Sequence, residues 1–175
     1  MTGELLDTIL RRIVVVEGGV SNHASDRGGL TAHGLTRPFL ETVTGRSWTD
    51  AQIVAIGSEN AIAIYKLWAM MRRLDQLPED YLLAWVVVDF AVIAGERRAI
   101  RAIQKYMGVP ADGIAGAETQ GAWHRLTPEE CRGAALFVLA ERIAHHGADI
   151  TANPGQAANA KGWANRVAEQ VRACA

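Results

Sequence analysis

The sequence predicts a mainly α-helical protein arranged around one buried helix. Two observations support this fold class. Apolar residues recur at three- and four-residue spacings along most of the 175 residues, which is typical of amphipathic helices. Residues 81–93 are apolar on every side, so this helix must be enclosed by others. The one region without this periodicity, residues 20–35, is rich in glycine and predicts a loop or a small hairpin.

Capping residues and glycines mark where the helices begin and end. Gly18 and Gly19 end a first helix over about residues 4–17, because glycine adopts the left-handed conformation that other residues avoid. Thr49 and Thr127 each precede a glutamine or glutamate by three residues, which predicts capping boxes. We expect another helix to begin near residue 36 and three more to run over residues 58–74, 81–93 and 97–107. The last helix should end near residue 173.

Composition indicates a folded globular chain. Apolar residues make up 49% and charged residues 21%, and the length fits one domain or one domain with a small lobe. The net charge of −1 gives no electrostatic reason to expect a nucleic acid or an anionic membrane as partner. Several arginines between residues 72 and 101 could form a local basic patch, but solvated helix faces are the simpler interpretation.

The cysteines and the N-terminus bear on the cellular compartment. Cys131 and Cys174 lie far apart in the chain, which does not imply a disulfide framework. The start of the chain lacks the pattern of a signal peptide. The most apolar run, Tyr81 to Ala94, is too short to span a bilayer and contains Asp89. We therefore expect a soluble monomer, made in the cytoplasm without stable membrane insertion.

Glu17 is the strongest candidate for a catalytic group. It follows Ile13 by four residues and Ile9 by eight, so it should share their inward face. It also lies in the last helical turn, where the negative end of the helix dipole opposes a carboxylate. Desolvation and the dipole both favour a protonated carboxyl, which a general acid needs near neutral pH. The alternative is a structural glutamate that accepts hydrogen bonds from backbone amides of the following loop.

Asp26 and Thr31 follow in the glycine-rich segment. In an inverting glycosidase, a second carboxylate, roughly 6.5–9.5 Å from the carboxyl group of the acid, activates a water. Asp26 could take that role, and Thr31 could hold the same water. The alternative is that Asp26 caps the Gly28-Gly29 turn and Thr31 bonds local backbone, which both residue types commonly do.

A set of short motifs gives the chain a family resemblance over nearly its whole length. The motifs near the start are Glu17-Gly18-Gly19, Ser21-Asn22, Asp26-Arg27-Gly28-Gly29-Leu30-Thr31 and Gly34-Leu35. Those that follow are Tyr65, Trp68, Asp75-Gln76-Leu77-Pro78 and Asp89-Phe90-Ala91-Val92, then Gly108 to Gly116, and finally Gly162-Trp163-Ala164-Asn165-Arg166-Val167. Together they resemble the glycoside hydrolase family 108 lysozymes, which are N-acetylmuramidases of bacteria and phages.

The resemblance implies a lysozyme-like fold and hydrolysis of the β-1,4 bond between N-acetylmuramic acid and N-acetylglucosamine in peptidoglycan. It gives Glu17 the acid role, and the similar order in phage lysozymes gives Asp26 and Thr31 the water-positioning role. It implies a catalytic part over residues 1–94 and a helical peptidoglycan-binding segment over 95–175, packed as one unit. No metal or organic cofactor is implied. Similarity to phage endolysins implies release to the periplasm by a holin.

Some further residues have a less specific interpretation. Asn22, Tyr65, Trp68 and Asp89 are candidates for substrate binding. The alternative is that the two rings are core residues and that Asp89 is a buried acid with donors around it. His23 and His33 flank Asp26 without a third metal ligand. Val20 and Ile93 replace an aromatic residue and an asparagine of the family pattern. These departures keep a non-catalytic peptidoglycan-binding protein as an alternative, beside a lytic transglycosylase.

Overall fold

The computed structural model describes residues 1–21 and 29–175, and its contacts divide the chain into two compact units. One, here the N-terminal unit, comprises Thr2–Asp75. The other, the C-terminal unit, comprises Gln76–Ala175 together with Met1. The division falls before the central apolar helix, whereas the resemblance placed a catalytic part over residues 1–94. That functional boundary stays a prediction.

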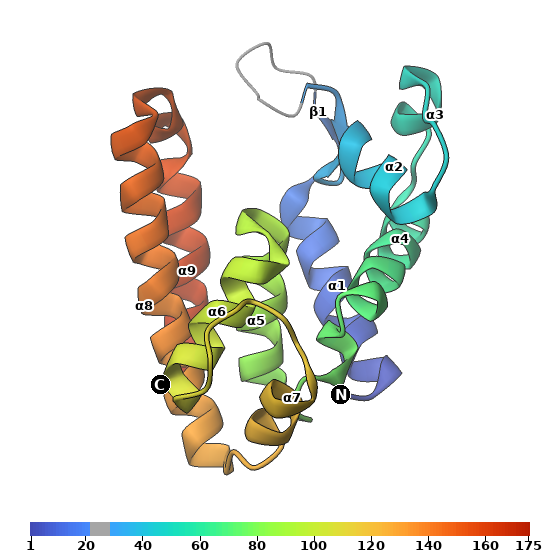
Figure 1. Ribbon diagram of the computed structural model, residues 1–175. Helices are drawn as coiled ribbons and strands as arrows, with labels where there is room; N and C mark the ends of the chain where they lie inside the picture. Colours follow the sequence, from blue (N-terminus) through green and yellow to red (C-terminus); the bar gives the residue numbers. More distant parts are fainter. Residues whose placement is uncertain (22–28) are drawn as a thin grey trace. The chain divides into compact units, whose positions relative to one another are not determined.

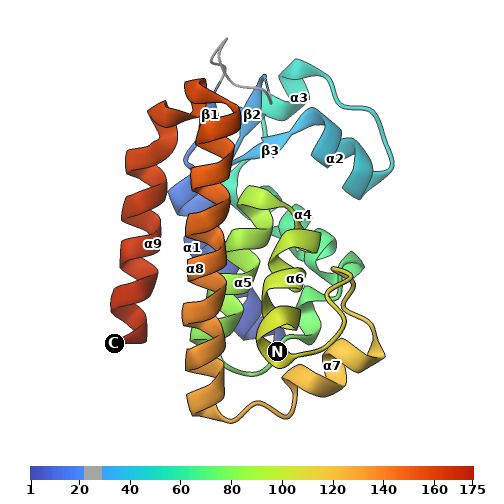
Figure 2. The same cartoon turned by 60° about the vertical axis from the view of Figure 1, so that its left-hand side comes forward.

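The N-terminal unit combines helices with a small antiparallel sheet (Figure 1). Its elements are α1 (Gly3–Glu17), β1 (Val20–Ser21), β2 (Thr31–Ala32), β3 (Leu35–Thr36), α2 (Arg37–Thr44), α3 (Asp50–Val54) and α4 (Ser58–Met71), followed by the 3₁₀ helix η1 (Leu74–Gln76). Helix α1 packs against α4 through an apolar face, and α4 also contacts α2. The sheet lies at the end of α1 in the order β1-β2-β3 (Figure 2).

Local capping accounts for the ends of these helices. The Thr49 hydroxyl accepts from the Gln52 amide and the Gln52 side chain accepts from the Thr49 amide, so the predicted capping box is present. Helix α1 ends at Glu17 as predicted, with Gly18 as its cap. Helix α4 ends at Met71, three residues earlier than predicted, because Arg73 adopts a left-handed φ of 58°. Val16, which follows Ile13 by three residues and so continues the apolar periodicity of α1, is 49% exposed.

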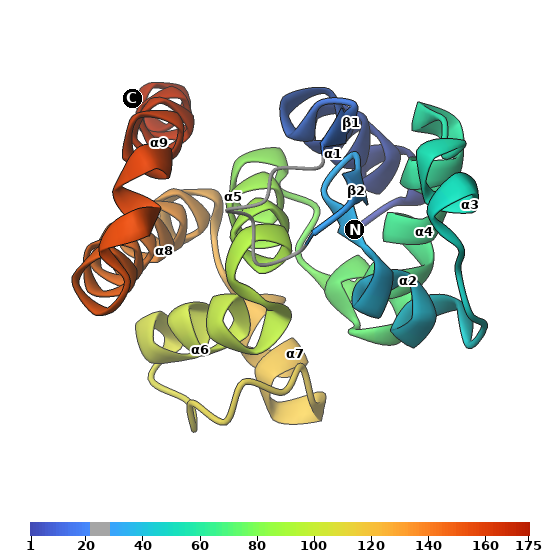
Figure 3. The same cartoon turned by 90° about the horizontal axis from the view of Figure 1, so that it is seen from above.

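The C-terminal unit encloses the apolar helix α5 (Tyr81–Ala94), as the sequence predicted. Its other elements are α6 (Glu96–Met107), α7 (Ala117–Trp123), α8 (Pro128–Ala152), the 3₁₀ helix η2 (Pro154–Asn159) and α9 (Ala160–Cys174). Helix α5 packs against α6, α8 and α9 (Figure 3). The result is a mainly α-helical, lysozyme-like fold.

Two further properties concern the described residues as a whole. Among their helices, none is both long enough and apolar enough to cross a membrane. Cys131 and Cys174 are buried free thiols. Burial raises the pKa of the Cys131 thiol to about 11, which keeps it protonated and unreactive at neutral pH.

Candidate active site

Glu17 lies at the C-terminal end of α1, where the helix meets the small sheet. The residues that precede it on the inward face, Ile13 and Val14, are buried, whereas the Glu17 side chain is half-buried. Gly18 ends the helix with a φ of 77°, and the chain turns directly into β1. Glu17 is therefore held by a packed helix yet remains partly accessible, as a group that meets a substrate must be.

A two-residue turn of the sheet approaches the same place. Ala32 pairs with Leu35, so His33 and Gly34 form the loop between β2 and β3. Both have positive φ, 52° and 77°, which is the type I′ arrangement of tight hairpins. The His33 amide also donates to the Gly19 carbonyl at 3.1 Å. This bond ties the turn to the segment that follows Glu17.

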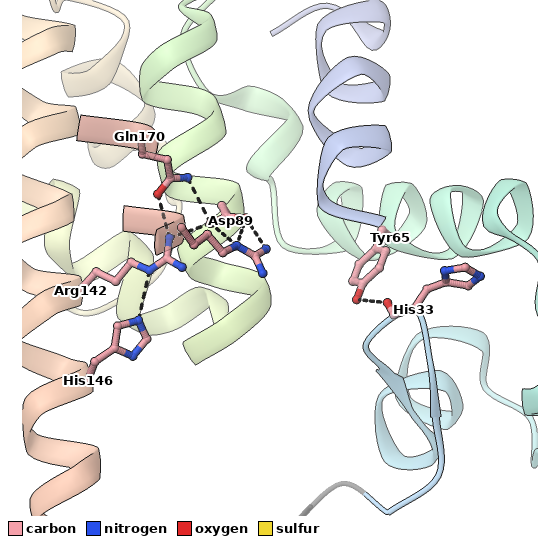
Figure 4. A network of polar contacts seen from close by, with 7 residues as sticks. His33, Tyr65, Asp89, Arg142, His146 and Gln170 are labelled. Carbon is pink, nitrogen blue, oxygen red and sulfur yellow. Dashed lines mark hydrogen bonds and ion pairs between the residues drawn. The ribbon is translucent and has the colours of Figure 1, made fainter. Parts of the chain in front are cut away.

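The turn lies directly against the Glu17 carboxyl group. A Cβ atom placed on Gly34 would lie 2.7 Å from Glu17 Oε2 and 2.9 Å from the Tyr65 hydroxyl oxygen. The Tyr65 hydroxyl donates to the His33 carbonyl at 3.0 Å, as Figure 4 shows. The N-terminal unit thus brings α1, the β2–β3 turn and α4 together at one carboxylate.

Tyr65 and Trp68 belong to an aromatic cluster with Phe39. The ring centroids of Phe39 lie 5.6 Å from Tyr65 and 5.7 Å from Trp68. Tyr65 is 1% exposed and Trp68 4% exposed. Neither ring presents a face on which a sugar could stack, because core packing covers both. Tyr65 contributes its hydroxyl group to the site, a role that no pattern in the sequence indicated.

The remaining residues predicted around Glu17 are described unequally. Thr31 is half-buried in β2, paired with Ser21 on one side and Thr36 on the other, in the sheet whose turn reaches Glu17. Asn22, His23 and Asp26 lie outside the described residues. Their assigned roles stay predictions from the sequence.

Asp89 lies in the C-terminal unit as a buried counter-ion for two arginines. Its carboxylate, 1% exposed, accepts from Arg142 Nη1 at 2.6 Å and from Arg166 Nε at 2.9 Å. Gln170 Nε2 donates to the same carboxylate at 3.1 Å (Figure 4). A buried acid at this position needs donors, as the sequence predicted, and these three residues supply them. Contact between Asp89 and a substrate stays a prediction.

His146 extends this network. Its Nε2 accepts from Arg142 Nε at 3.2 Å, and its ring stacks on Trp163 with centroids 4.3 Å apart. Burial and the adjacent Arg142 charge lower the pKa of His146 to about 4. His146 therefore stays neutral at physiological pH. It lies within α8, which continues to Ala152.

The Asp112 to Gly116 segment is a turn held by the buried side chain of Gln104. The Gly113 amide donates to Gln104 Oε1 at 2.8 Å, and Gln104 Nε2 donates to Asp112 at 2.8 Å and to Thr119 at 2.9 Å. The hydrogen bond from Gln104 is the main cause that lowers the pKa of the Asp112 carboxyl. These contacts give the motif a structural role in joining α6 to α7.

No group of three or more histidine, cysteine, aspartate or glutamate side chains gathers among residues 1–21 and 29–175. His33 Nδ1 is buried and has no hydrogen-bond partner within this described part of the chain. The arrangement around Glu17 is suited to proton transfer by a single carboxyl group.

Comparisons with known proteins agree with the fold. A family model described as Glycosyl hydrolase 108 matches residues 10–95, a span that contains Glu17, Thr31, Gly34 and Tyr65. The solved structure of SagA from Brucella abortus superimposes with a TM-score of 0.79. It is 25% identical in sequence, and the alignment covers 99% of this chain and 95% of SagA. The comparison with curated proteins gives no match.

Proposed function

Residues 10–95 belong to the glycosyl hydrolase 108 family, and from this premise we propose that the protein is a lysozyme that cuts the glycan strands of peptidoglycan. The bond we assign is the β-1,4 linkage between N-acetylmuramic acid and N-acetylglucosamine. The family match supports a glycoside hydrolase. The choice of bond is the finer part of the proposal.

The observation that carries the proposal is the setting of Glu17. A glutamate at the end of a packed helix, beside a small sheet and partly accessible, can place a proton on a bound glycosidic oxygen. Rigid elements on two sides, α4 and the β2–β3 turn, restrict where its carboxyl group can move. Such restriction supports efficient proton transfer because catalysis depends on orientation.

The proposed reaction is a single displacement. The Glu17 proton goes to the oxygen that links the two sugars, and the bond from that oxygen to the anomeric carbon breaks. A water molecule, deprotonated by Asp26 and held by Thr31, forms the new bond to the anomeric carbon. The products are two shorter glycan strands, one with a new reducing end. No metal or organic cofactor takes part in this proposal.

The proposal extends to where the enzyme acts. Peptidoglycan lies outside the cytoplasmic membrane, so the protein must reach the periplasm to meet its substrate. We propose that it works there as a monomer, after release by a holin, and that cell-wall degradation leads to lysis.

Product analysis on purified sacculi tests the proposal. Wild-type protein is expected to release reducing ends, and Glu17→Gln to reduce the rate by about 10²–10⁴ while keeping the fold. Glu4→Gln is the matched control, because it makes the same change in the first turn of α1, on an exposed residue. This control should keep full activity.

Mass spectrometry of the products separates the alternatives. Anhydro-muramic acid ends would indicate a lytic transglycosylase and refute hydrolysis. Binding to sacculi without release of any product would indicate a non-catalytic peptidoglycan-binding protein. Equal activity of Glu17→Gln and wild type would refute the role of Glu17.

A further inference from the structure

We propose that Tyr65 and Gly34 are positioning residues for the Glu17 carboxyl group, acting through the His33–Gly34 turn. This inference deepens the proposed function and rests on Glu17 being the general acid. It assigns to Tyr65 a role for its hydroxyl group, in place of sugar stacking by its ring.

Gly34 lies close to the Glu17 carboxyl group. A Cβ on this residue would lie 2.7 Å from Glu17 Oε2 and 3.1 Å from Glu17 Cδ. Cβ atoms essentially never make contacts shorter than 3.0 Å, so a side chain here requires the Glu17 carboxyl group, the Tyr65 hydroxyl or the turn itself to shift. Gly34 also has a φ of 77°, which side chains rarely adopt. Glycine at this position therefore allows the backbone of the turn to lie directly against the Glu17 side chain.

Two hydrogen bonds hold the His33–Gly34 turn in place. The Tyr65 hydroxyl donates to the His33 carbonyl at 3.0 Å, and the His33 amide donates to the Gly19 carbonyl at 3.1 Å. His33 therefore has one bond to α4 and another to the segment after Glu17. Its own φ of 52° is uncommon for a residue other than glycine, so the surrounding contacts must hold it.

Core packing holds the Tyr65 ring in place. The ring is 1% exposed and packs against Phe39 and Trp68, on a helix that itself packs against α1. Its hydroxyl therefore has a fixed position relative to the turn. The hydroxyl oxygen and Glu17 Oε2 lie 2.9 Å and 2.7 Å, respectively, from the Cβ position of Gly34. A hydroxyl group held in this way is a positioning device for a neighbouring carboxyl group.

The consequence concerns turnover rather than substrate binding. A general acid must direct its proton at the leaving oxygen, and a displacement of about 1 Å can cost on the order of 10²-fold in rate. Loss of the Tyr65 hydroxyl or of the space at Gly34 should therefore lower kcat and leave KM nearly unchanged.

The experiment compares Tyr65→Phe, Gly34→Ala and Gly45→Ala with the wild type on soluble peptidoglycan fragments. Tyr65→Phe keeps the ring and its packing. Gly45→Ala is the matched control for backbone strain, because Gly45 has a φ of 68° and nothing within 4 Å of its Cβ position. Expected decreases in kcat are about tenfold for Tyr65→Phe and about 10²-fold for Gly34→Ala, with KM within twofold of the wild type. Gly45→Ala should keep kcat.

A second readout does not depend on turnover. With ¹³C-labelled glutamate, the Glu17 carboxyl signal is identified by its loss in Glu17→Gln. It should change its chemical shift in Tyr65→Phe and Gly34→Ala but not in Gly45→Ala. A kcat of Tyr65→Phe within twofold of the wild type, or equal losses in the two glycine variants, would overturn the inference. An inactive wild type would refute the proposed function, and an unmoved Glu17 signal would then refute the positioning as well.

Discussion

Arg142 donates to Asp89 across 2.6 Å, between two side chains that are almost fully buried and 53 residues apart in sequence. The pair joins α8 to the central helix α5, and Arg166 and Gln170 extend it to α9. Because burial of a charge is costly unless a partner meets it, the network makes the packing of these helices interdependent.

We expect Asp89→Asn to destabilise the protein by about 3–5 kcal/mol, because it leaves the Arg142 charge buried without its counter-ion. Urea denaturation monitored by circular dichroism measures the change. Glu59→Gln breaks the exposed pair with Arg11 and should leave the unfolding midpoint almost unchanged. Equal midpoints for Asp89→Asn and the wild type would contradict the structural role of the network.

Stability should fall with acidification through His146. Its pKa is about 4 in the folded protein and about 6.5 when unfolded, so the unfolded state binds the proton first. Stability is therefore complete above pH 6.5 and is lost as the pH falls towards 4, by on the order of 1–3 kcal/mol. Unfolding free energies measured at intervals over this range test the prediction.

His146→Gln is the control for that measurement. Its side-chain oxygen can still accept from Arg142 Nε, but the residue does not titrate. The variant should lose part of the pH dependence between 6.5 and 4. A slope identical to that of the wild type would show that His146 is not its source.

Gln104→Leu should destabilise the C-terminal unit by about 1–3 kcal/mol, because the buried Gly113 amide loses its acceptor. Thermal unfolding measures the effect. Gln120→Leu removes a single, partly buried contact to the Ala115 carbonyl and should cost less. If Gln104→Leu kept the wild-type Tm, the Asp112 to Gly116 turn would not depend on this side chain.

Thr31→Val tests the predicted water-positioning role. Valine keeps the β-branched shape that suits β2 and removes only the hydroxyl, so the fold should persist while kcat falls by about tenfold. Reducing-end release from sacculi measures the rate. Thr8→Val, on the exposed side of α1, removes a hydroxyl that donates to the Glu4 carbonyl and should keep full activity. Unchanged kcat in Thr31→Val would restrict Thr31 to a structural role in the sheet.

Much of the helical architecture was predictable from local sequence. Thr49 and Thr127 begin helices through capping boxes, Gly18 ends α1, and the apolar segment after Asp80 forms the enclosed helix α5. These features depend on residues within a few positions of one another, so the pattern contains the relevant physics. The end of α4 differed because Arg73 takes a left-handed conformation, which no local residue preference indicates.

The sequence by itself determined that Glu17 ends the first helix, just before a glycine-rich segment, and that a buried acid at position 89 needs donors. Only the tertiary structure decided which groups meet them: the turn at Gly34 and the Tyr65 hydroxyl beside Glu17, and Arg142 and Arg166 at Asp89. The physical reason is separation along the chain. Tyr65 lies 32 residues from His33, and Arg166 lies 77 from Asp89, so only tertiary packing brings these residues together.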